Sequence, residues 1–148
     1  MIQLRPFWLT VFVTGMVILA LGTLHPRGQD YLARVRQDLM IVSAGRAIAE
    51  GLAQYYENSP GSVKQYPFGL QDLLSDPRFA VRQQYLTEIP NDPVTGKPTW
   101  IEMRDANGAV WGVRSTSTAI PTLIGKVFAL RSLDGARHSD WIFGNEPN

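Results

Sequence analysis

The chain has 148 residues, of which 45% are hydrophobic and 18% are charged; this composition fits a small folded domain with a membrane segment and argues against disorder. The net charge of +1 gives no electrostatic case for a nucleic-acid partner or an anionic lipid surface. The sequence has no cysteine, which excludes disulfide bonds, thiolate zinc sites and cysteine nucleophiles.

An uncharged run, "FWLTVFVTGMVILALGTL", extends from Phe7 to Leu24 after a short tail, residues 1–6. As a helix it would be about 27 Å long, close to the hydrocarbon thickness of a bilayer, and it is apolar on every face. We therefore interpret residues 7–24 as a retained transmembrane helix. Two alternatives stay open: a cleaved secretory signal, with Arg5 as its charged start and small residues at Ala20-Leu21-Gly22, and a buried core helix.

A long amphipathic helix is predicted within residues 25–59, because the stretch from about Gln29 to Glu57 has no proline and carries apolar residues at helical spacing. At roughly 43 Å it would be longer than a domain of this size can cover, so its first half is expected to project or to pack against other chains. The first apolar stripe therefore supplies the predicted subunit-interface residues, which are Leu32, Val35, Leu39 and Val42.

The second half of this helix is rich in alanine and glycine, and it is expected to pack beneath a sheet. Charged residues, Asp38 among them, mark the side of the helix that should face water. Pro26 predicts a kink or a break before the helix, and "NSPGS" after Glu57 predicts its end.

Residues 60–98 are expected to connect the helix to the sheet. "YPFGLQDLLSDPRF" predicts a short helix that stops at Asp76-Pro77, and Tyr85, Leu86 and Ile89 are expected to anchor the next loop to the core. "YLTEIPNDPVTGKPTW" then predicts a rigid bridge, because prolines fix φ and Asn, Asp and Gly favour turns. Its predicted structural turn residues are Pro90, Asp92, Pro93 and Gly96.

Residues 99–148 are expected to form a small antiparallel sheet. Strands are predicted over Thr99–Arg104 and Ala109–Ser115, and Asn107-Gly108 between them predicts a type I′ turn, with positive φ at both central residues. "SDWIF", residues 139–143, predicts a third strand, while "TLIGKVFAL" is compatible with a short helix or a strand.

No motif in the chain predicts catalysis or a cofactor. His25 and His138 are far apart in sequence, and no nucleophile motif surrounds His138-Ser139-Asp140. The remaining candidate oxygen ligands lack the spacing of a calcium loop and are interpreted as solvated turn carboxylates: Asp92, Asp105, Asp134 and Asp140. We therefore expect a protein that is not an enzyme and that holds no metal or cofactor.

The order of these features resembles the type IV pilin-like proteins, and most closely the pseudopilins of bacterial type II secretion systems. The patterns that carry the resemblance are "YP..L..LL" and "YL..IP.DP.TG...W", which are similar to that family's junction between helix and sheet. The resemblance implies an α+β fold, in which an N-terminal transmembrane segment continues into a long α-helix packed on a small antiparallel β-sheet. It also implies that the C-terminal domain lies in the periplasm, a placement that the count of positive charges does not favour.

The N-terminus departs from the family pattern. Pro6 stands where the family has the glycine of the processing site, and Val11 stands where it has a glutamate. In the family that glutamate neutralises the terminal amine of a neighbouring subunit inside the membrane, where an unpaired charge is costly. The calcium loop of major pseudopilins would correspond to "STSTAIPTLIG", which contains no acid, so no metal site is carried over.

We therefore expect a minor pseudopilin or assembly accessory of a type II secretion or type IV pilus-type machine. It would be a single-pass protein of the bacterial inner membrane, with other pseudopilins or pilins and inner-membrane assembly proteins as partners, and nucleic acid is not an expected partner. The alternative is a periplasmic binding module, membrane-anchored or released from a signal peptide, that recognises an exported substrate or DNA. An anchored enzyme is a third alternative with little support.

Overall fold

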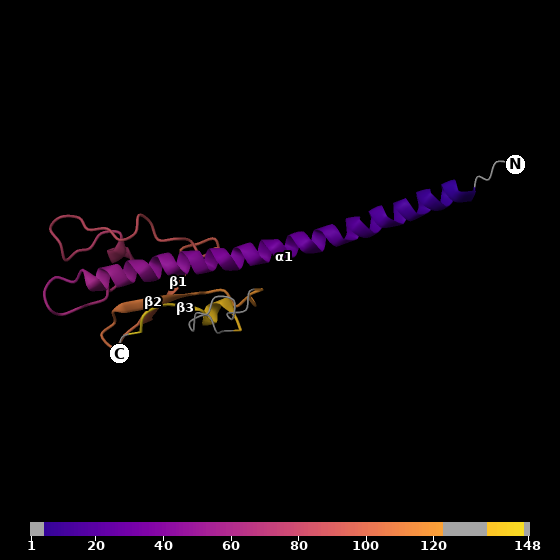
Figure 1. The fold of residues 1–148 in the computed structure, drawn as a ribbon. Coiled ribbons are helices and arrows are strands. Elements are labelled where there is room, and N and C mark those ends of the chain that lie inside the picture. Colours follow the sequence, from indigo (N-terminus) through magenta and orange to yellow (C-terminus); the bar gives the residue numbers. More distant parts are fainter. Residues whose placement is uncertain (1–4, 123–135, 147–148) are drawn as a thin grey trace. The chain divides into compact units, whose positions relative to one another are not determined.

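The computed structural model describes residues 5–122 and 136–146, and within the helix it describes the side chains of Thr14, Met16 and every residue from Gln29 onward. Asp134 and the element predicted for "TLIGKVFAL", from Leu123 on, lie outside these ranges. The described elements are α1 (Arg5–Glu57), η1 (Leu70–Leu73), β1 (Trp100–Arg104), β2 (Val110–Ser115), η4 (His138–Asp140) and β3 (Ile142–Gly144). Together they form an α+β protein with one long helix and a three-stranded antiparallel sheet, as predicted (Figure 1).

The chain divides into two compact units, residues 1–34 and residues 35–148. The first unit is helical from Arg5 onward, and the helix continues through Pro26 without interruption, so the predicted break there is wrong. A proline inside a helix removes one hydrogen bond at a cost of about 3 kcal/mol, and α1 nevertheless stays helical on both sides of Pro26. Among the residues that the structure describes, no helix combines the length and the apolar character needed to cross a membrane.

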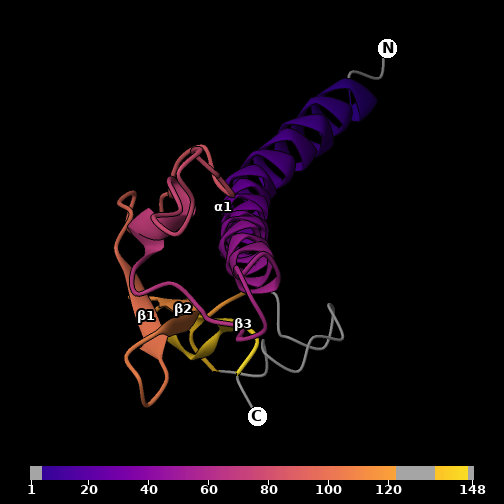
Figure 2. The ribbon, with the colours of Figure 1, turned by 90° about the vertical axis from the view of Figure 1, so that its left-hand side faces the viewer.

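The second unit is built around the C-terminal half of α1, which packs against the sheet as predicted. Residues at alternating spacings of three and four line one face of the helix, and the core residues among them are Ile41, Ile48, Leu52 and Tyr55. The sheet contributes Trp100, Val110, Val113 and Phe143, and η1 contributes Leu70 and Leu73. The connecting segment lies along one side of this half of α1 and the sheet along another (Figures 1 and 2). The resulting architecture is compatible with a pilin-like α+β fold.

Gly45 sets how closely the helix approaches the sheet. It lies on the buried face of α1, and a Cβ atom there would lie 2.6 Å from Cε2 of Phe143 and still closer to two other atoms of that ring. The ring of Phe143, which is 4% exposed, therefore occupies the space that any other residue at position 45 would need.

The three strands are all antiparallel, in the order β1-β2-β3. Trp100 pairs with Ser115 and Glu102 with Val113, so the pairing of β1 with β2 is regular over this part of the strand. The register then shifts between Met103 and Arg104, and the shift leaves Trp111 as an extra residue on β2. The third strand begins later than predicted, because residues 138–140 form the 3-10 turn η4 before β3.

The β1–β2 hairpin lies where Asn107-Gly108 predicts it, but the type I′ turn is wrong. The N–H of Gly108 donates to the carbonyl of Asp105 at 3.0 Å, which makes Ala106 and Asn107 the central residues. Gly108 follows them with φ +82°, the arrangement of a three-residue loop that ends in a left-handed glycine. The Asp105 carboxylate favours this earlier turn, because it accepts the N–H groups of Asn107 and Ala109.

Candidate functional site

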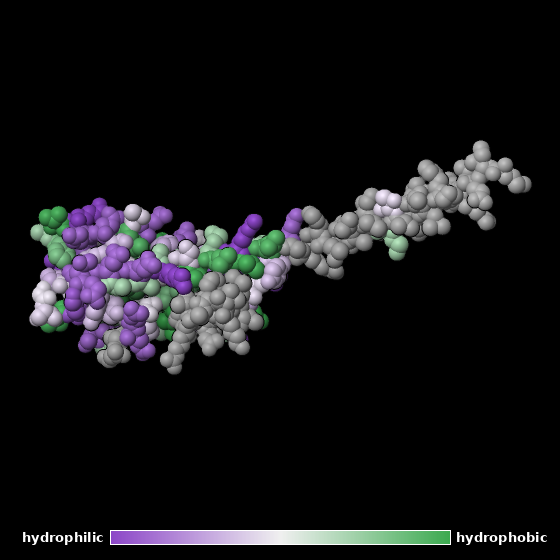
Figure 3. Space-filling view, viewed as in Figure 1, coloured by the Kyte–Doolittle hydropathy of each residue, from purple (hydrophilic) through white to green (hydrophobic). Residues whose placement is uncertain are grey.

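The exposed face of α1 is the first candidate surface. Within the second unit Leu39 is 45% exposed and Met40 is 59% exposed, and Val35 is half-buried. Leu32, in the first unit, is 55% exposed. Val42 is only 4% exposed and belongs to the core, so its prediction as a subunit-interface residue is wrong: it lies on the buried side of the helix beside Ile41. Hydrophobic side chains reach the surface along α1 in Figure 3.

Residues 90–98, within the bridge predicted over residues 85–100, are hydrogen-bonded both to the sheet and to α1. The carbonyl of Pro90 accepts a 2.7 Å hydrogen bond from Nε1 of Trp100, and the carbonyl of Pro93 accepts one from Gln37 on α1. Gly96 has φ +68°, and its N–H donates to the carbonyl of Asp92, which closes a tight turn. The bridge therefore joins α1 to the first strand.

Asp92 is the centre of this bridge, and the prediction that its carboxylate is solvated is wrong. Its side chain is fully buried. One carboxylate oxygen accepts the N–H of Val94 at 2.9 Å, and the other accepts the hydroxyl of Ser115 at the end of β2. That hydroxyl in turn accepts the N–H of Ser117. A buried acid with these partners positions the bridge against the sheet.

A second buried acid, Asp38, joins α1 to the C-terminal segment. It is 2% exposed, although the sequence pattern assigned it to the side facing water, so that interpretation is wrong. Its Oδ1 lies 2.7 Å from Nε2 of His138, and its Oδ2 accepts the N–H of Thr122. Because a carboxylate accepts, Nε2 of the histidine is the donor of this bond. His138 is 3% exposed and packs edge-on against Trp141.

A third buried acid, Asp76, closes the C-terminal end of α1 through Arg78. The guanidinium of Arg78 binds both carboxylate oxygens of Asp76. It also donates to the carbonyl of Tyr55 at 2.7 Å and to the hydroxyl of Ser59 at 2.8 Å. Its central carbon lies 3.6 Å from the centre of the Tyr55 ring. Tyr85 adds a hydrogen bond to Asp76 at 3.0 Å. Arg78 thereby satisfies a carbonyl that the helix end would otherwise leave without a partner.

This network shifts the pKa of its members. Burial alone would raise the pKa of Asp76, but the hydrogen bonds from Arg78 and Tyr85 outweigh it and hold that pKa below its ordinary value. Burial alone would lower the pKa of Arg78, but its interactions with Asp76, Tyr55 and Tyr85 together outweigh burial and raise that pKa. Burial also raises the pKa of Tyr55 to about 12. The pair is therefore charged throughout the neutral range.

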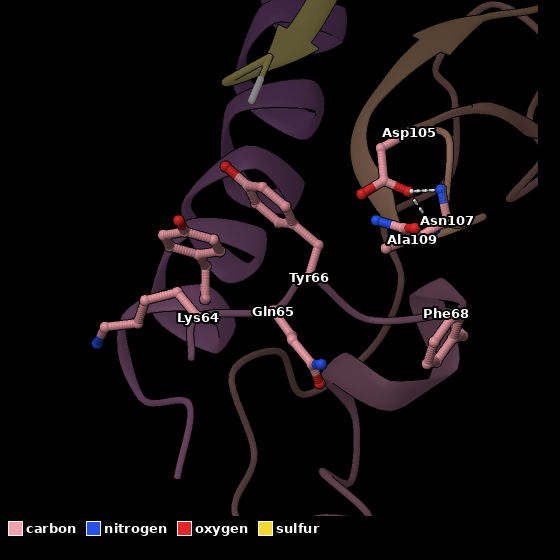
Figure 4. A pocket seen from close by; sticks show the side chains of 8 residues that line it. Lys64, Gln65, Tyr66, Phe68, Asp105, Asn107 and Ala109 are labelled. Carbon is pink, nitrogen blue, oxygen red and sulfur yellow. Dashed lines mark hydrogen bonds between the residues drawn. The ribbon is translucent and has the colours of Figure 1, made fainter. Parts of the chain in front are cut away.

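Described residues of the second unit line two surface hollows. One, of about 210 Å³, is lined by Tyr56, Lys64, Gln65, Tyr66, Phe68, Asp105, Asn107 and Ala109 (Figure 4). The rings of Tyr56 and Tyr66 stack at 4.5 Å, and the ammonium group of Lys64 points away from Asp105 and Asn107. The other, of about 450 Å³, lies beside β1 and is called the β1 groove.

Within the described ranges, no group of three or more histidine or acidic side chains is placed to hold a metal ion. His138, Ser139 and Asp140 lie in η4, where the histidine faces Asp38 and the N–H of Ser139 donates to the carbonyl of Ser117. Comparisons with family models, with curated proteins and with solved structures find no match to this chain.

Proposed function

We propose that this chain is a non-catalytic, pilin-like structural subunit, a minor pseudopilin or assembly accessory of a type II secretion or type IV pilus-type machine. The observation that carries the proposal is the junction of residues 90–98, whose buried Asp92 binds Ser115 of β2 while Pro93 binds Gln37 of α1. This is the region whose sequence resembles the family. The packing of α1 on a three-stranded antiparallel sheet supports the same proposal.

In this proposal residues 7–24 cross the bacterial inner membrane once, and the sheet lies in the periplasm. The support for the span is the uncharged run itself, which has the length of a bilayer's hydrocarbon core. Pro6 and Val11 replace the two family residues needed for processing and for pairing with a neighbouring amine, which suits a minor subunit with an unprocessed N-terminus.

Assembly would use the exposed face of α1. Leu39 and Met40 are apolar and exposed at successive positions of the second unit, and Leu32, in the first unit, is apolar and exposed as well. Exposed apolar residues clustered on one helix are typical of a surface that another helix covers. Other pseudopilins or pilins and inner-membrane assembly proteins are the partners that the proposal names.

The experiment places a photo-crosslinking amino acid at Leu39 in the full-length protein in its own cells, with Glu50, exposed on the same helix, as the control position. The expected result is a membrane-integral protein that resists carbonate extraction and crosslinks to pilin-like subunits from position 39 but not from position 50. Met40→Glu, at the neighbouring position, should abolish the crosslink from position 39 and leave the fold intact, because the Met40 side chain is 59% exposed. Extraction by carbonate, or equal crosslinking from both positions, would contradict the proposal.

The alternative is a periplasmic binding module, anchored or released, and the hollow in Figure 4 is the observation that favours it. Its aromatic rings and its polar groups from the hairpin turn are of the kind found in small-ligand sites. Loss of function on substituting Phe68, together with normal function of Met40→Glu, would select this alternative.

A further inference from the structure

The outer edge of β1 is unpaired in the part of the chain that the structure describes. The sheet order is β1-β2-β3, so β1 has a strand on one side only. In an antiparallel ladder about half of the backbone N–H and C=O groups of an edge strand point away from its partner. Outside the ladder with β2, the backbone groups of Trp100–Arg104 make no hydrogen bond to any described residue. Such an edge is a template for another strand.

The β1 groove lies beside this edge. From β1 it is lined by Trp100 and Glu102, which share one face of the strand, together with Pro98 just before it. The opposite wall comes from η1 and its neighbours and from the loop that precedes the bridge: Gly69, Leu70, Gln71, Leu74, Thr87, Glu88 and Ile89. A strand added to β1 would share its pleat, so every second side chain of that strand would enter the groove.

The charge of the groove is one-sided. Its lining contains two acids, Glu88 and Glu102, and no lysine or arginine. Glu102 pairs with Arg104 along the strand, whereas Glu88 is exposed and has no ion pair or hydrogen bond to a described residue. The remaining surface includes the apolar side chains of Leu70, Leu74 and Ile89. A complementary ligand therefore carries apolar groups and at least one positive charge.

We infer that the β1 edge binds an extended segment of a partner protein as a fourth strand, with apolar and basic side chains of that segment directed into the β1 groove. Backbone hydrogen bonds to β1 hold the segment, and Glu88 selects a lysine or arginine at a groove-facing position. This site is separate from the exposed face of α1, and it does not depend on the pilin-like assignment.

The test uses the full-length protein in mild detergent and an acetylated, amidated heptapeptide in which valine, lysine and valine alternate with serine. Saturable binding, measured by calorimetry, is expected, together with slower amide hydrogen exchange in β1. A peptide with N-methyl groups on its edge-facing amides should not bind, because the added strand depends on those donors. Equal binding of the N-methylated peptide, or no saturable binding up to millimolar concentration, overturns the inference.

A charge exchange tests the role of Glu88. Glu88→Lys should weaken binding of the lysine peptide about fivefold or more and strengthen binding of the matching peptide with glutamate in place of lysine. Glu50→Lys makes the same charge change at an exposed position on α1 and should alter neither affinity. If Glu50→Lys and Glu88→Lys have equal effects, the groove does not select the charge. If the chain instead dimerises through β1 and excludes the peptide, the occupant is a second copy and the inference is wrong.

Discussion

Replacing Gly45 by alanine tests the packing of α1 against the sheet at its closest point. On an exposed helix the change would stabilise the protein by about 1 kcal/mol, because alanine has the better helix propensity. At this position the new methyl group meets the Phe143 ring well inside 3.0 Å, a separation that real Cβ atoms essentially never show. The clash reaches Cγ, the root of the ring, so rotation of the outer ring cannot relieve it.

The magnitude follows from these two opposing effects. Overpacking a well-filled core costs about 1–3 kcal/mol, and Phe143 is nearly fully buried between the helix and Trp100. Subtracting the propensity gain leaves an expected fall in the free energy of unfolding of up to about 2 kcal/mol. Gly51→Ala is the matched control on the same helix. Its nearest neighbour is Cγ of the half-buried Leu86 at 3.2 Å, which can move, so this change should fall within about 1 kcal/mol of zero.

The assay is urea unfolding of a fragment that begins near Gly28, followed by tryptophan fluorescence, since Trp100 and Trp141 are buried in the core. A double-mutant cycle with Phe143→Ala adds a change of sign: once the ring is gone, Gly45→Ala should stabilise the fragment. If Gly45→Ala stabilises the fragment that still contains Phe143, or if Gly51→Ala is equally damaging, the helix does not approach the sheet as described.

Three further changes test the turn and the buried acids. Gly108→Ala should lower the free energy of unfolding by about 1–2 kcal/mol, because φ is +82° at this residue and no atom lies near the new methyl group. Gly69→Ala is the control, since that site is equally open but its backbone is extended, and it should have a smaller effect. Equal effects of the two changes would contradict the turn. Asp92→Ala should cost about 2–4 kcal/mol in urea unfolding, and Asp92→Asn less, because the amide oxygen still accepts one of its hydrogen bonds; a neutral Asp92→Ala would mean that the bridge is not held there. The pKa of Asp76 is below its ordinary value of 3.8, so the stability that its carboxylate contributes is present above about pH 4 and is lost as the pH falls through the lowered pKa. As the pH is lowered below about pH 4, the unmodified fragment should therefore lose more stability than Asp76→Asn, and parallel curves for the two would refute this.

The elements that could be predicted from the sequence are those set by neighbouring residues. Both long strands were predicted to within one residue, and the long helix ends at Glu57 as expected, because alternation, propensity and stop signals are local. The hairpin position followed from Asn107-Gly108. The turn centre did not, because it depends on the hydrogen bonds of Asp105 and on the register shift opposite Met103.

The buried acids could not be predicted in the same way, because their partners are distant in sequence. Asp38 and His138 are 100 residues apart, and Asp92 and Ser115 are 23 apart. One signal was available for Asp38: it lies three residues before Ile41 and seven before Gly45, on the helix face that carries the core. That spacing indicates burial, whereas the charge alone indicates exposure, and the spacing was the better guide.

One of these buried acids, Asp76, also helps to position a wall of the β1 groove. The loop of Thr87–Ile89 that forms one wall is held on one side by Tyr85, whose hydroxyl binds Asp76 and whose N–H donates to the carbonyl of Leu73. On the other side it runs into the bridge, where Pro90 is bound by Trp100. A wall fixed at both ends loses little conformational freedom when a ligand binds, so most of the interaction energy remains available as affinity. Asp76→Asn should therefore weaken peptide binding to β1 without any contact to the peptide, and unchanged affinity in that variant would show that the wall is positioned by packing alone.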